Sequence, residues 1–181
     1  AIVECGVWRG GSMMAAAQTL LALGDSERTL WLYDTYEGMS EPTDRDVNRG
    51  DRAARRRWER AQREGHNAWN YAPLDDVRRH VLSTGYPASG VRFVKGKVED
   101  TIPGAVPERI AILRLDTDFY ESTYHELLHL YPRLAPRGVL LLDDYGHWRG
   151  AREAVDRFLA EQRPPILLDR IDYSGRIAVK P

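Results

Sequence analysis

Short apolar runs alternate with stretches of helical periodicity along most of the chain. The apolar runs, which we predict to be strands, are Ile2–Cys5, Thr29–Tyr33, Val91–Val94, Ile110–Leu115 and Gly138–Leu142. Apolar positions recur with helical spacing in Ser12–Leu23, Pro73–Ser83, Tyr120–Leu134 and Arg149–Gln162. Because the strands lack polar alternation and helices separate them, the pattern predicts an α/β fold, with a parallel sheet covered on both faces.

Two further apolar runs, Pro165–Leu168 and Arg176–Val179, follow the last predicted helix. Only a short segment separates them, and closely spaced strands pair in antiparallel fashion. We therefore expect a hairpin that gives the mostly parallel sheet an antiparallel edge.

The polar stretch from Thr35 to Tyr71 interrupts this rhythm, and we interpret it as a lid-like insertion. Within it, Arg52–Arg63 is compatible with a helix and contains the basic run Arg55-Arg56-Arg57 followed by Trp58. Acidic residues dilute this basic patch, so we interpret it as a solvated helix of the lid and expect no nucleic-acid partner. These acids are Asp44, Asp46, Asp51, Glu59 and Glu64.

Composition narrows the class of protein without indicating a partner. The 181 residues fit a single domain, which we place at 1–181. Charged residues nearly cancel, 26 basic against 27 acidic, so no overall field points to a polyanion. A single cysteine, Cys5, and the lack of a long apolar run predict a cytoplasmic protein with no membrane association. The chain opens directly in a strand, so we expect that a preceding N-terminal segment is missing.

Acidic residues close the predicted strands or the turns after them. Asp34 follows the second strand, Asp116-Thr117-Asp118 the fourth, and Asp143-Asp144 the fifth. Parallel α/β sheets bind their ligands at the carboxyl ends of the strands. The sequence therefore predicts a functional site at this edge of the sheet.

The loop after the first strand carries glycines at positions 6, 10 and 11, which is not the spacing of a dinucleotide fingerprint. Glu4 precedes the first glycine, an arrangement that suits a ligand with an ammonium group, such as the amino-acid end of S-adenosylmethionine. Asp34 would accept hydrogen bonds from ribose hydroxyls. The structural alternatives are that Ser12 caps the first helix and that Asp34 caps the following turn.

Asp116, Asp143 and Asp144 form the strongest constellation of candidate site residues. If the fourth and fifth strands are neighbours, three carboxylates converge without a basic partner, and a hard divalent cation such as Mg²⁺ would relieve their repulsion. Such an ion would lower the pKa of a bound hydroxyl. Alternatively, Asp143-Asp144 caps the helix that begins near Arg149. His147, at the same rim, is a candidate substrate contact or base.

The remaining histidine pair and the cysteine are interpreted as structural. His125 and His129 stand four residues apart, a spacing compatible with zinc, but apolar neighbours indicate a packed or exposed helix face. Cys5 lies within a predicted strand and is expected to be buried in the core.

Several motifs, in chain order, resemble the macrocin O-methyltransferase family. They are Val3-Glu4-Cys5-Gly6-Val7-Trp8-Arg9-Gly10-Gly11-Ser12, Tyr33-Asp34-Thr35-Tyr36-Glu37-Gly38-Met39, Leu113-Arg114-Leu115-Asp116-Thr117-Asp118-Phe119-Tyr120-Glu121-Ser122-Thr123 and Leu142-Asp143-Asp144-Tyr145-Gly146. The resemblance runs from about Ile2 to Val179. It implies a Rossmann-like class I methyltransferase with a mostly parallel seven-stranded sheet, and an S-adenosylmethionine- and Mg²⁺-dependent enzyme that methylates sugar hydroxyls on macrolide and similar antibiotics.

The resemblance also assigns roles to residues. Glu4, Gly6, Val7, Trp8, Gly10 and Ser12 would line the methionine and ribose side of the cofactor, Val98 and Glu99 would border the adenine, and Asp34 would bind the ribose. Asp116, Asp143 and Asp144 would hold Mg²⁺, with Asp116 also beside the cofactor. Catechol-type enzymes, which are similar in their metal arrangement, use a lysine base. Phe119 falls at that position here, so Asp116 or Asp118 becomes the candidate base, and the choice stays open.

Two other functions are compatible with the residues. One is a metal-dependent glycosyltransferase that uses Asp116-Thr117-Asp118 as a D-x-D site, and the other is a non-catalytic methyltransferase-like binding domain. For the enzyme we expect a small glycosylated acceptor and a homo-oligomer. The acceptor itself cannot be identified from the sequence, because lids and loops determine it.

Overall fold

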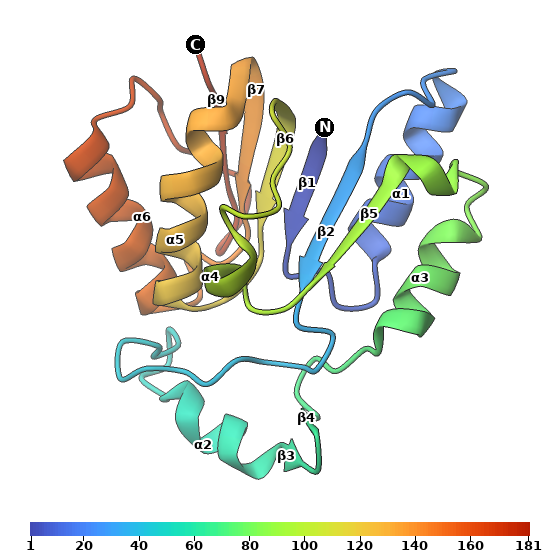
Figure 1. Ribbon diagram of the computed structural model, residues 1–181. Helices are drawn as coiled ribbons and strands as arrows, with labels where there is room; N and C mark the ends of the chain where they lie inside the picture. The colour runs from blue at the N-terminus through green and yellow to red at the C-terminus, as the bar shows by residue number, and fades with distance from the viewer.

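The computed structural model describes all residues from 1 to 181 and contains one large sheet with helices on both faces (Figure 1). Its strands, in chain order, are β1 (Ile2–Cys5), β2 (Leu30–Asp34), β5 (Val91–Lys95), β6 (Ile110–Leu115), β7 (Leu134–Leu142), β8 (Asp169–Arg170) and β9 (Arg176–Val179). The spatial order is β5-β2-β1-β6-β7-β9-β8. All neighbours up to β7 are parallel, whereas β9 pairs antiparallel with both β7 and β8. The predicted seven-stranded, mostly parallel sheet with an antiparallel edge is confirmed.

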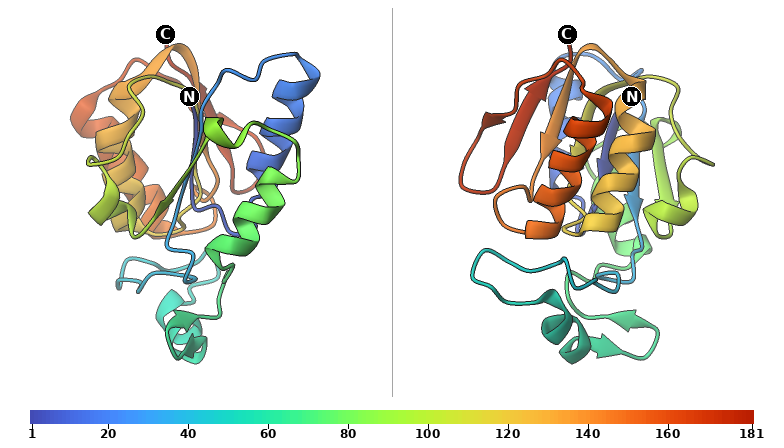
Figure 2. Two further views of the ribbon diagram at one scale, coloured as in Figure 1. Left: turned by 45° about the vertical axis from the view of Figure 1, so that its right-hand side comes forward. Right: turned by 90° about the vertical axis from the view of Figure 1, so that its left-hand side faces the viewer.

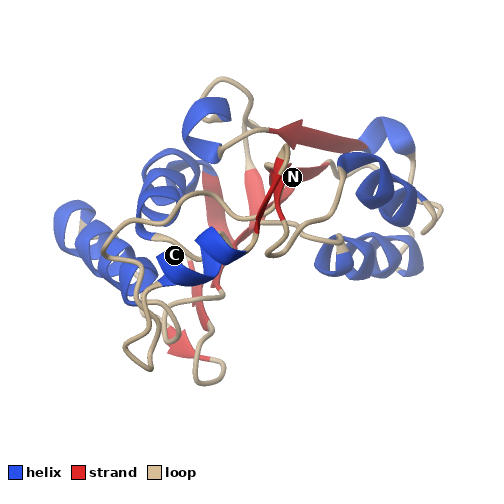
Figure 3. Cartoon of the chain, turned by 90° about the horizontal axis from the view of Figure 1, so that it is seen from below, coloured by secondary structure: helices blue, strands red, loops and turns tan.

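Two groups of helices flank the sheet, as the view from the carboxyl ends of the strands shows (Figure 3). The main helices are α1 (Gly11–Ala22), α3 (Leu74–Leu82), α4 (Val98–Thr101), α5 (Tyr120–Leu130) and α6 (Arg149–Gln162). Successive side chains of β1 point to opposite faces of the sheet, so this strand contributes to both layers of the core. Ile2 packs with residues of α1 and α3, while Val3 and Cys5 pack with residues of α5 and α6. Cys5 is fully buried, as expected for a core residue.

The structure corrects three predicted boundaries near prolines. The helix predicted to reach Leu134 ends at Leu130 and continues as a 3₁₀ turn, η2 (Tyr131–Arg133), because Pro132 has no amide hydrogen to donate. Strand β7 therefore begins at Leu134, four residues earlier than predicted. The predicted strand Pro165–Leu168 is wrong, since this segment is a loop and the hairpin instead pairs β8 with β9.

The insertion between β2 and α3 is folded rather than structureless. It contains α2 (Ala54–Arg60) and the hairpin of β3 (Gln62–Arg63) and β4 (His66–Asn67). A short 3₁₀ turn, η1 (Ala88–Gly90), follows α3 further along the chain. In all views the insertion lies beneath the lower edge of the sheet, where β1 and β2 end (Figures 1 and 2). It therefore covers the edge at which the site residues were predicted.

Buried Asp46 fastens the insertion to the body of the molecule. Its carboxylate accepts hydrogen bonds from the amide of Thr43 at 2.7 Å and from the amide of Tyr120, at the start of α5, at 2.9 Å. Main-chain bonds from Arg49 to the carbonyl of His147 and from Arg149 to Val47 add a second attachment. The insertion is thus docked against the loop that follows β7. No helix of the chain is both long and apolar enough to cross a membrane.

Candidate active site

The first loop is held in place by Asp34 at the end of β2. One carboxylate oxygen accepts hydrogen bonds from the amides of Val7 and Trp8, at 2.7 and 3.0 Å, and the other accepts one from Tyr36 at 2.7 Å. A carboxylate offers roughly four acceptor positions, so one is left beyond these main-chain bonds for a ribose hydroxyl. The main-chain bonds that Asp34 accepts fix both the glycine loop and the start of the insertion.

A small cavity beside this loop contains several of the predicted cofactor residues. Its volume is about 60 Å³, and it is lined by Gly6, Asp34, Val98, Glu99 and Asp116 among others. Gly6 has a φ of 81°, and a Cβ there would overlap the carbonyl oxygen of Asp116. Ligand pockets usually enclose about 300–1,000 Å³, so a nucleoside-sized cofactor requires the cavity to widen.

Not all of the predicted cofactor residues line this cavity. Gly10 is the residue before α1 and packs against Val81 of α3. Ser12 lies inside the first turn of α1, after the capping residue Gly10, so the alternative that it caps this helix is wrong. Trp8 is half exposed, at 49%, with a φ of 46°.

Glu4 is a buried residue with one carboxylate oxygen that has no hydrogen-bond partner. Its side chain is buried, one oxygen accepts a hydrogen bond from Arg114 at 2.6 Å, and the Oε2 atom has no partner. Burial raises the pKa of Glu4 to about 7, although the guanidinium of Arg114 opposes this shift. An orphaned carboxylate oxygen beside the glycine loop fits a ligand that presents an ammonium group.

The three predicted metal ligands are brought together at the adjacent strand ends. Carboxylate oxygens of Asp116, Asp143 and Asp144 lie within 4.8 Å of one another. Burial raises the pKa of Asp116 to about 8 and that of Asp144 well above its usual range, with neighbouring carboxylates adding to both shifts. An oxygen-only set of this kind fits a hard divalent cation such as Mg²⁺.

The expectation that these acids have no basic partner is wrong. Arg114 of β6 donates to Asp116 at 2.7 Å, to Asp143 at 2.8 Å and to Glu4 at 2.6 Å. The sequence contained the signal for this contact. Arg114 precedes Asp116 by two residues, so both point to one face of the strand, and Glu4 is directly opposite Arg114 in the pairing of β1 with β6. The guanidinium therefore links the cofactor loop to the acid cluster.

Asp118 is not one of the three converging acids, but it contacts one of them and is oriented by a residue of another segment. Its carboxylate accepts a hydrogen bond from the indole nitrogen of Trp148 at 2.7 Å, and its amide donates to Asp144 at 3.2 Å. The backbone adopts a left-handed φ of 67°, which aspartate tolerates better than most residues. Burial raises the pKa of Asp118. Trp148, which sequence reasoning missed, fixes this side chain in position.

The histidines occupy two different environments. His147 lies beside Trp148, with ring centroids 5.1 Å apart, and lines a second and larger cavity under the insertion. His125 is hydrogen-bonded to the carbonyl of Ile102 at 2.9 Å and contacts His129 on a partly packed helix face. The interpretation of the latter pair as structural agrees with this geometry.

Comparison with known proteins places this arrangement in a family. The family model described as macrocin O-methyltransferase (TylF) matches residues 1–178. The chain belongs to this family. It is 42% identical over 174 residues to an 8-demethyl-8-(2,3-dimethoxy-α-L-rhamnosyl)-tetracenomycin-C 4'-O-methyltransferase of Streptomyces olivaceus, and 34% identical over 176 residues to a demethyldecarbamoylnovobiocin O-methyltransferase of Streptomyces niveus. Both alignments cover 96% of this chain and 63% of the relative.

A solved structure supports the same assignment. The O-methyltransferase NovP is 32% identical, with a TM-score of 0.84, and the match covers 99% of this chain and 71% of that one. This member of the macrocin O-methyltransferase family thus has a class I methyltransferase fold. The chain spans a little under two thirds of the length of the curated relatives described above.

Proposed function

We propose that this chain forms the catalytic part of an S-adenosylmethionine- and Mg²⁺-dependent O-methyltransferase that acts on a sugar hydroxyl of a glycosylated natural product. The observation that carries the proposal is the adjacency of two sites. The orphaned carboxylate of Glu4 and the acid cluster at Asp116 lie on either side of one guanidinium, that of Arg114. Family membership and the names of the relatives support the reaction and the acceptor class.

In this proposal the cofactor loop recognises the two ends of the donor. S-adenosylmethionine supplies the electrophilic methyl group when it is bound. Glu4 binds the ammonium of its amino-acid end through Oε2, and the free acceptor position of Asp34 takes a ribose hydroxyl. Val98 and Glu99, at the start of α4, border the base.

The acid cluster provides the site for Mg²⁺ in this proposal. Bound Mg²⁺ would hold two neighbouring acceptor oxygens and make the reacting hydroxyl more acidic. Asp116, Asp143 and Asp144 are its ligands in this proposal. The bonds that Arg114 makes to Asp116 and Asp143 are the ones a cation would replace, while the bond from Arg114 to Glu4 can persist.

Asp118 is the residue we assign as general base. Asp116 is occupied by Arg114 and belongs to the metal set, whereas Asp118 lies outside that set and is oriented by Trp148. Burial raises the pKa of Asp118, and a higher pKa makes the ionised carboxylate a stronger base. His147, which lines the larger cavity, is then a contact for the acceptor rather than the base.

The two alternative functions receive no comparable support. A D-x-D metal site requires Asp116 and Asp118 to act together, but the acids that converge are Asp116, Asp143 and Asp144. A non-catalytic domain would have no need for an Asp118 side chain that Trp148 orients.

The test is methyl transfer to the compounds named in the two relatives, with cofactor binding measured separately. We expect transfer that EDTA abolishes and that Asp118→Asn slows by about 10²–10⁴-fold, because general base catalysis typically contributes that factor. Calorimetry should show that Asp118→Asn binds S-adenosylhomocysteine like the parent protein. Asp169→Asn, on the distant edge strand, is the control. Full activity of Asp118→Asn would overturn its assignment as the base, and the absence of cofactor binding would overturn the function itself.

A further inference from the structure

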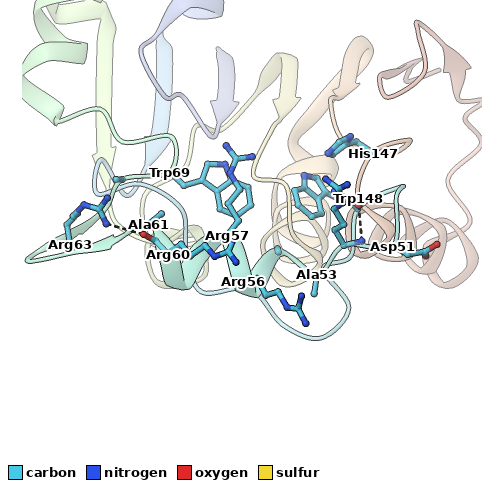
Figure 4. Close-up of a pocket in the computed structure, with 14 residues that line it drawn as sticks. Asp51, Ala53, Arg56, Arg57, Arg60, Ala61, Arg63, Trp69, His147 and Trp148 are labelled. Atoms are coloured by element: carbon cyan, nitrogen blue, oxygen red, sulfur yellow. Dashed lines mark hydrogen bonds between the residues drawn. The ribbon is translucent and has the colours of Figure 1, made fainter.

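A cavity of about 1,000 Å³ opens between the insertion and the loop that follows β7 (Figure 4). Five arginines of the insertion contribute to its lining: Arg52, Arg56, Arg57, Arg60 and Arg63. The opposite wall contains His147 and Trp148. Because the indole of Trp148 is hydrogen-bonded to Asp118, the cavity adjoins the acidic site through a single side chain.

The positive charge in this cavity is not balanced by protein acids. Asp51, the one acid that lines the cavity, is paired with Arg149. Arg63 donates to the carbonyls of Arg60 and Gln62, and Arg57 lies 4.1 Å from the ring centroid of Trp69. The guanidinium groups of Arg52, Arg56 and Arg60, by contrast, have no ion pair, no hydrogen bond and no aromatic contact.

Other arginines of the same insertion do have acidic partners. Arg55, the neighbour of Arg56 on α2, pairs with Glu41 at 2.9 Å, and Arg45 pairs with Glu153 at 2.8 Å. One of the acids expected to dilute the patch, Asp46, is buried and accepts main-chain hydrogen bonds. The arginines of the insertion that lack a partner therefore include three that line the cavity.

Helix stability alone does not account for these arginines. Arg56 and Arg60 stand four residues apart on α2, a spacing at which like charges repel. The helix dipole favours cations only in the last turn, which covers Arg60 but not Arg56 in the first turn or Arg52 before the helix. A bound anion would offset the repulsion among all three.

We propose that this cavity binds an anionic group of the acceptor, with the guanidinium groups of Arg52, Arg56 and Arg60 as its ligands. This inference rests on the proposed function, because it takes the cavity beside Asp118 as the acceptor site. The planar fork of a guanidinium matches the oxygens of a phosphate or a carboxylate. The acceptor is then either a sugar that carries a diphosphate or a glycoside whose aromatic part is ionised, and both present anionic oxygens to the guanidinium groups.

The experiment measures binding without any turnover. Calorimetry in EDTA, so that no divalent cation links ligand to protein, compares deoxythymidine diphosphate, 1-hydroxy-2-naphthoate and the neutral glycoside phenyl glucoside. We expect at least one anion to bind and the neutral compound to bind more weakly. Arg56→Gln and Arg60→Gln each remove one guanidinium. Each should lower the affinity for the anion about tenfold, the loss typical of one charge-assisted hydrogen bond. Arg56→Lys should recover part of this affinity.

The matched control is Arg163→Gln, which removes the same charge at the end of α6, where the side chain has no ion pair. Unfolding midpoints of all variants show whether a loss comes from misfolding. Equal binding of neutral and anionic compounds, or anion binding that Arg56→Gln and Arg60→Gln leave unchanged, would overturn the proposal, and so would the absence of binding by both anions. S-adenosylhomocysteine binding, measured in parallel, separates this failure from failure of the proposed function. The preferred anion identifies the acceptor as phosphorylated or as an acidic glycoside.

Discussion

Glu4 and Arg114 determine how the two halves of the site affect each other. They are directly opposite on neighbouring strands, and Arg114 reaches two members of the acid cluster as well. Arg114 stabilises the ionised form of Glu4, but burial has the larger effect on the pKa of this carboxyl. The folded protein therefore keeps Glu4 close to its protonation midpoint at neutral pH, a state that a bound ammonium would shift toward the charged form.

The raised pKa of Glu4 has a consequence for stability. An unfolded glutamate titrates near 4.5, whereas Glu4 in the folded chain titrates at about 7. The folded state thus binds an additional proton between these values, and the stability associated with that proton is present at low pH and lost as the pH rises through about 7. Glu4→Gln keeps the shape of the side chain without its charge. At pH 8 its free energy of unfolding should therefore exceed that of the parent by about 3 kcal/mol, and it should unfold at a higher denaturant concentration.

Urea unfolding at pH 4 and pH 8 measures this difference, which should be absent at the lower pH. The same variant should bind S-adenosylhomocysteine more weakly at pH 8, because it lacks the acceptor for the ammonium. A variant with unchanged cofactor affinity would show that Glu4 does not contact the ligand.

Sequence reasoning identified the acids of the site but not the residues that orient them. Asp116, Asp143 and Asp144 stand at strand ends, and topology alone brings such residues together. Trp148 and Asp46 act through contacts between segments far apart in the chain, so no local pattern marks them. Arg114 is the intermediate case, because strand periodicity and pairing register were enough to find it.

At the scale of elements, the insertion lines the small cofactor cavity as well as the larger cavity. The main chain of Glu37 and Met39 bonds to that of Asn67 and Trp69, at 2.7 and 3.0 Å. Gly38, Met39 and Ser40 in turn line the small cofactor cavity. Movement of the insertion would therefore change the width of this cavity, and cofactor binding should stabilise one position of the insertion.

Gly38→Ala tests this connection. Gly38 has a φ of 84°, and a Cβ there would overlap the carbonyl oxygen of Asn67, so alanine must push the two segments apart. We expect the variant to lose about 2 kcal/mol or more of unfolding free energy and to bind S-adenosylhomocysteine more weakly. Gly65→Ala, in the turn between β3 and β4, is the control, because its φ of 75° gives similar strain while nothing lies within 4 Å of a Cβ. Equal losses in both variants would argue against the connection.

The elements themselves differed in how far the sequence could predict them. Ile2–Cys5, Ile110–Leu115 and Arg149–Gln162 have the predicted bounds, since their apolar periodicity matches their burial. The insertion was predicted as a lid-like segment with a helix within Arg52–Arg63, where α2 lies, but its hairpin was not predicted. Its two-residue strands are too short for a periodic signal, and the contacts of buried Asp46 with Thr43 and Tyr120 hold the segment in place.

Across the whole molecule, charge of opposite sign gathers at two neighbouring sites. Carboxylates gather at the carboxyl ends of the strands, and unpaired arginines of the insertion line the cavity next to them. Their proximity allows an acceptor with a neutral sugar and a charged remainder to place its hydroxyls toward the acids and its anion toward the guanidinium groups. The net charge of −1 conceals this separation.

The folded chain holds three carboxylates close together, so a cation that binds them should stabilise the entire fold. Mg²⁺ at a hundred times its dissociation constant would add about 2.7 kcal/mol to the free energy of unfolding, which corresponds to a rise of roughly 5–10 °C in the unfolding midpoint for a protein of this size.

Without the ion, Asp144→Asn should be more stable than the parent at pH 8, because burial and neighbouring carboxylates raise the pKa of Asp144 and the ionised form is costly. The same variant should gain less from Mg²⁺. Calorimetric melting with MgCl₂ or EDTA measures both effects, with exposed Asp75→Asn as the control. If Mg²⁺ raises the unfolding midpoints of the parent and of Asp144→Asn equally, the cation binds elsewhere and the acid cluster is not its site.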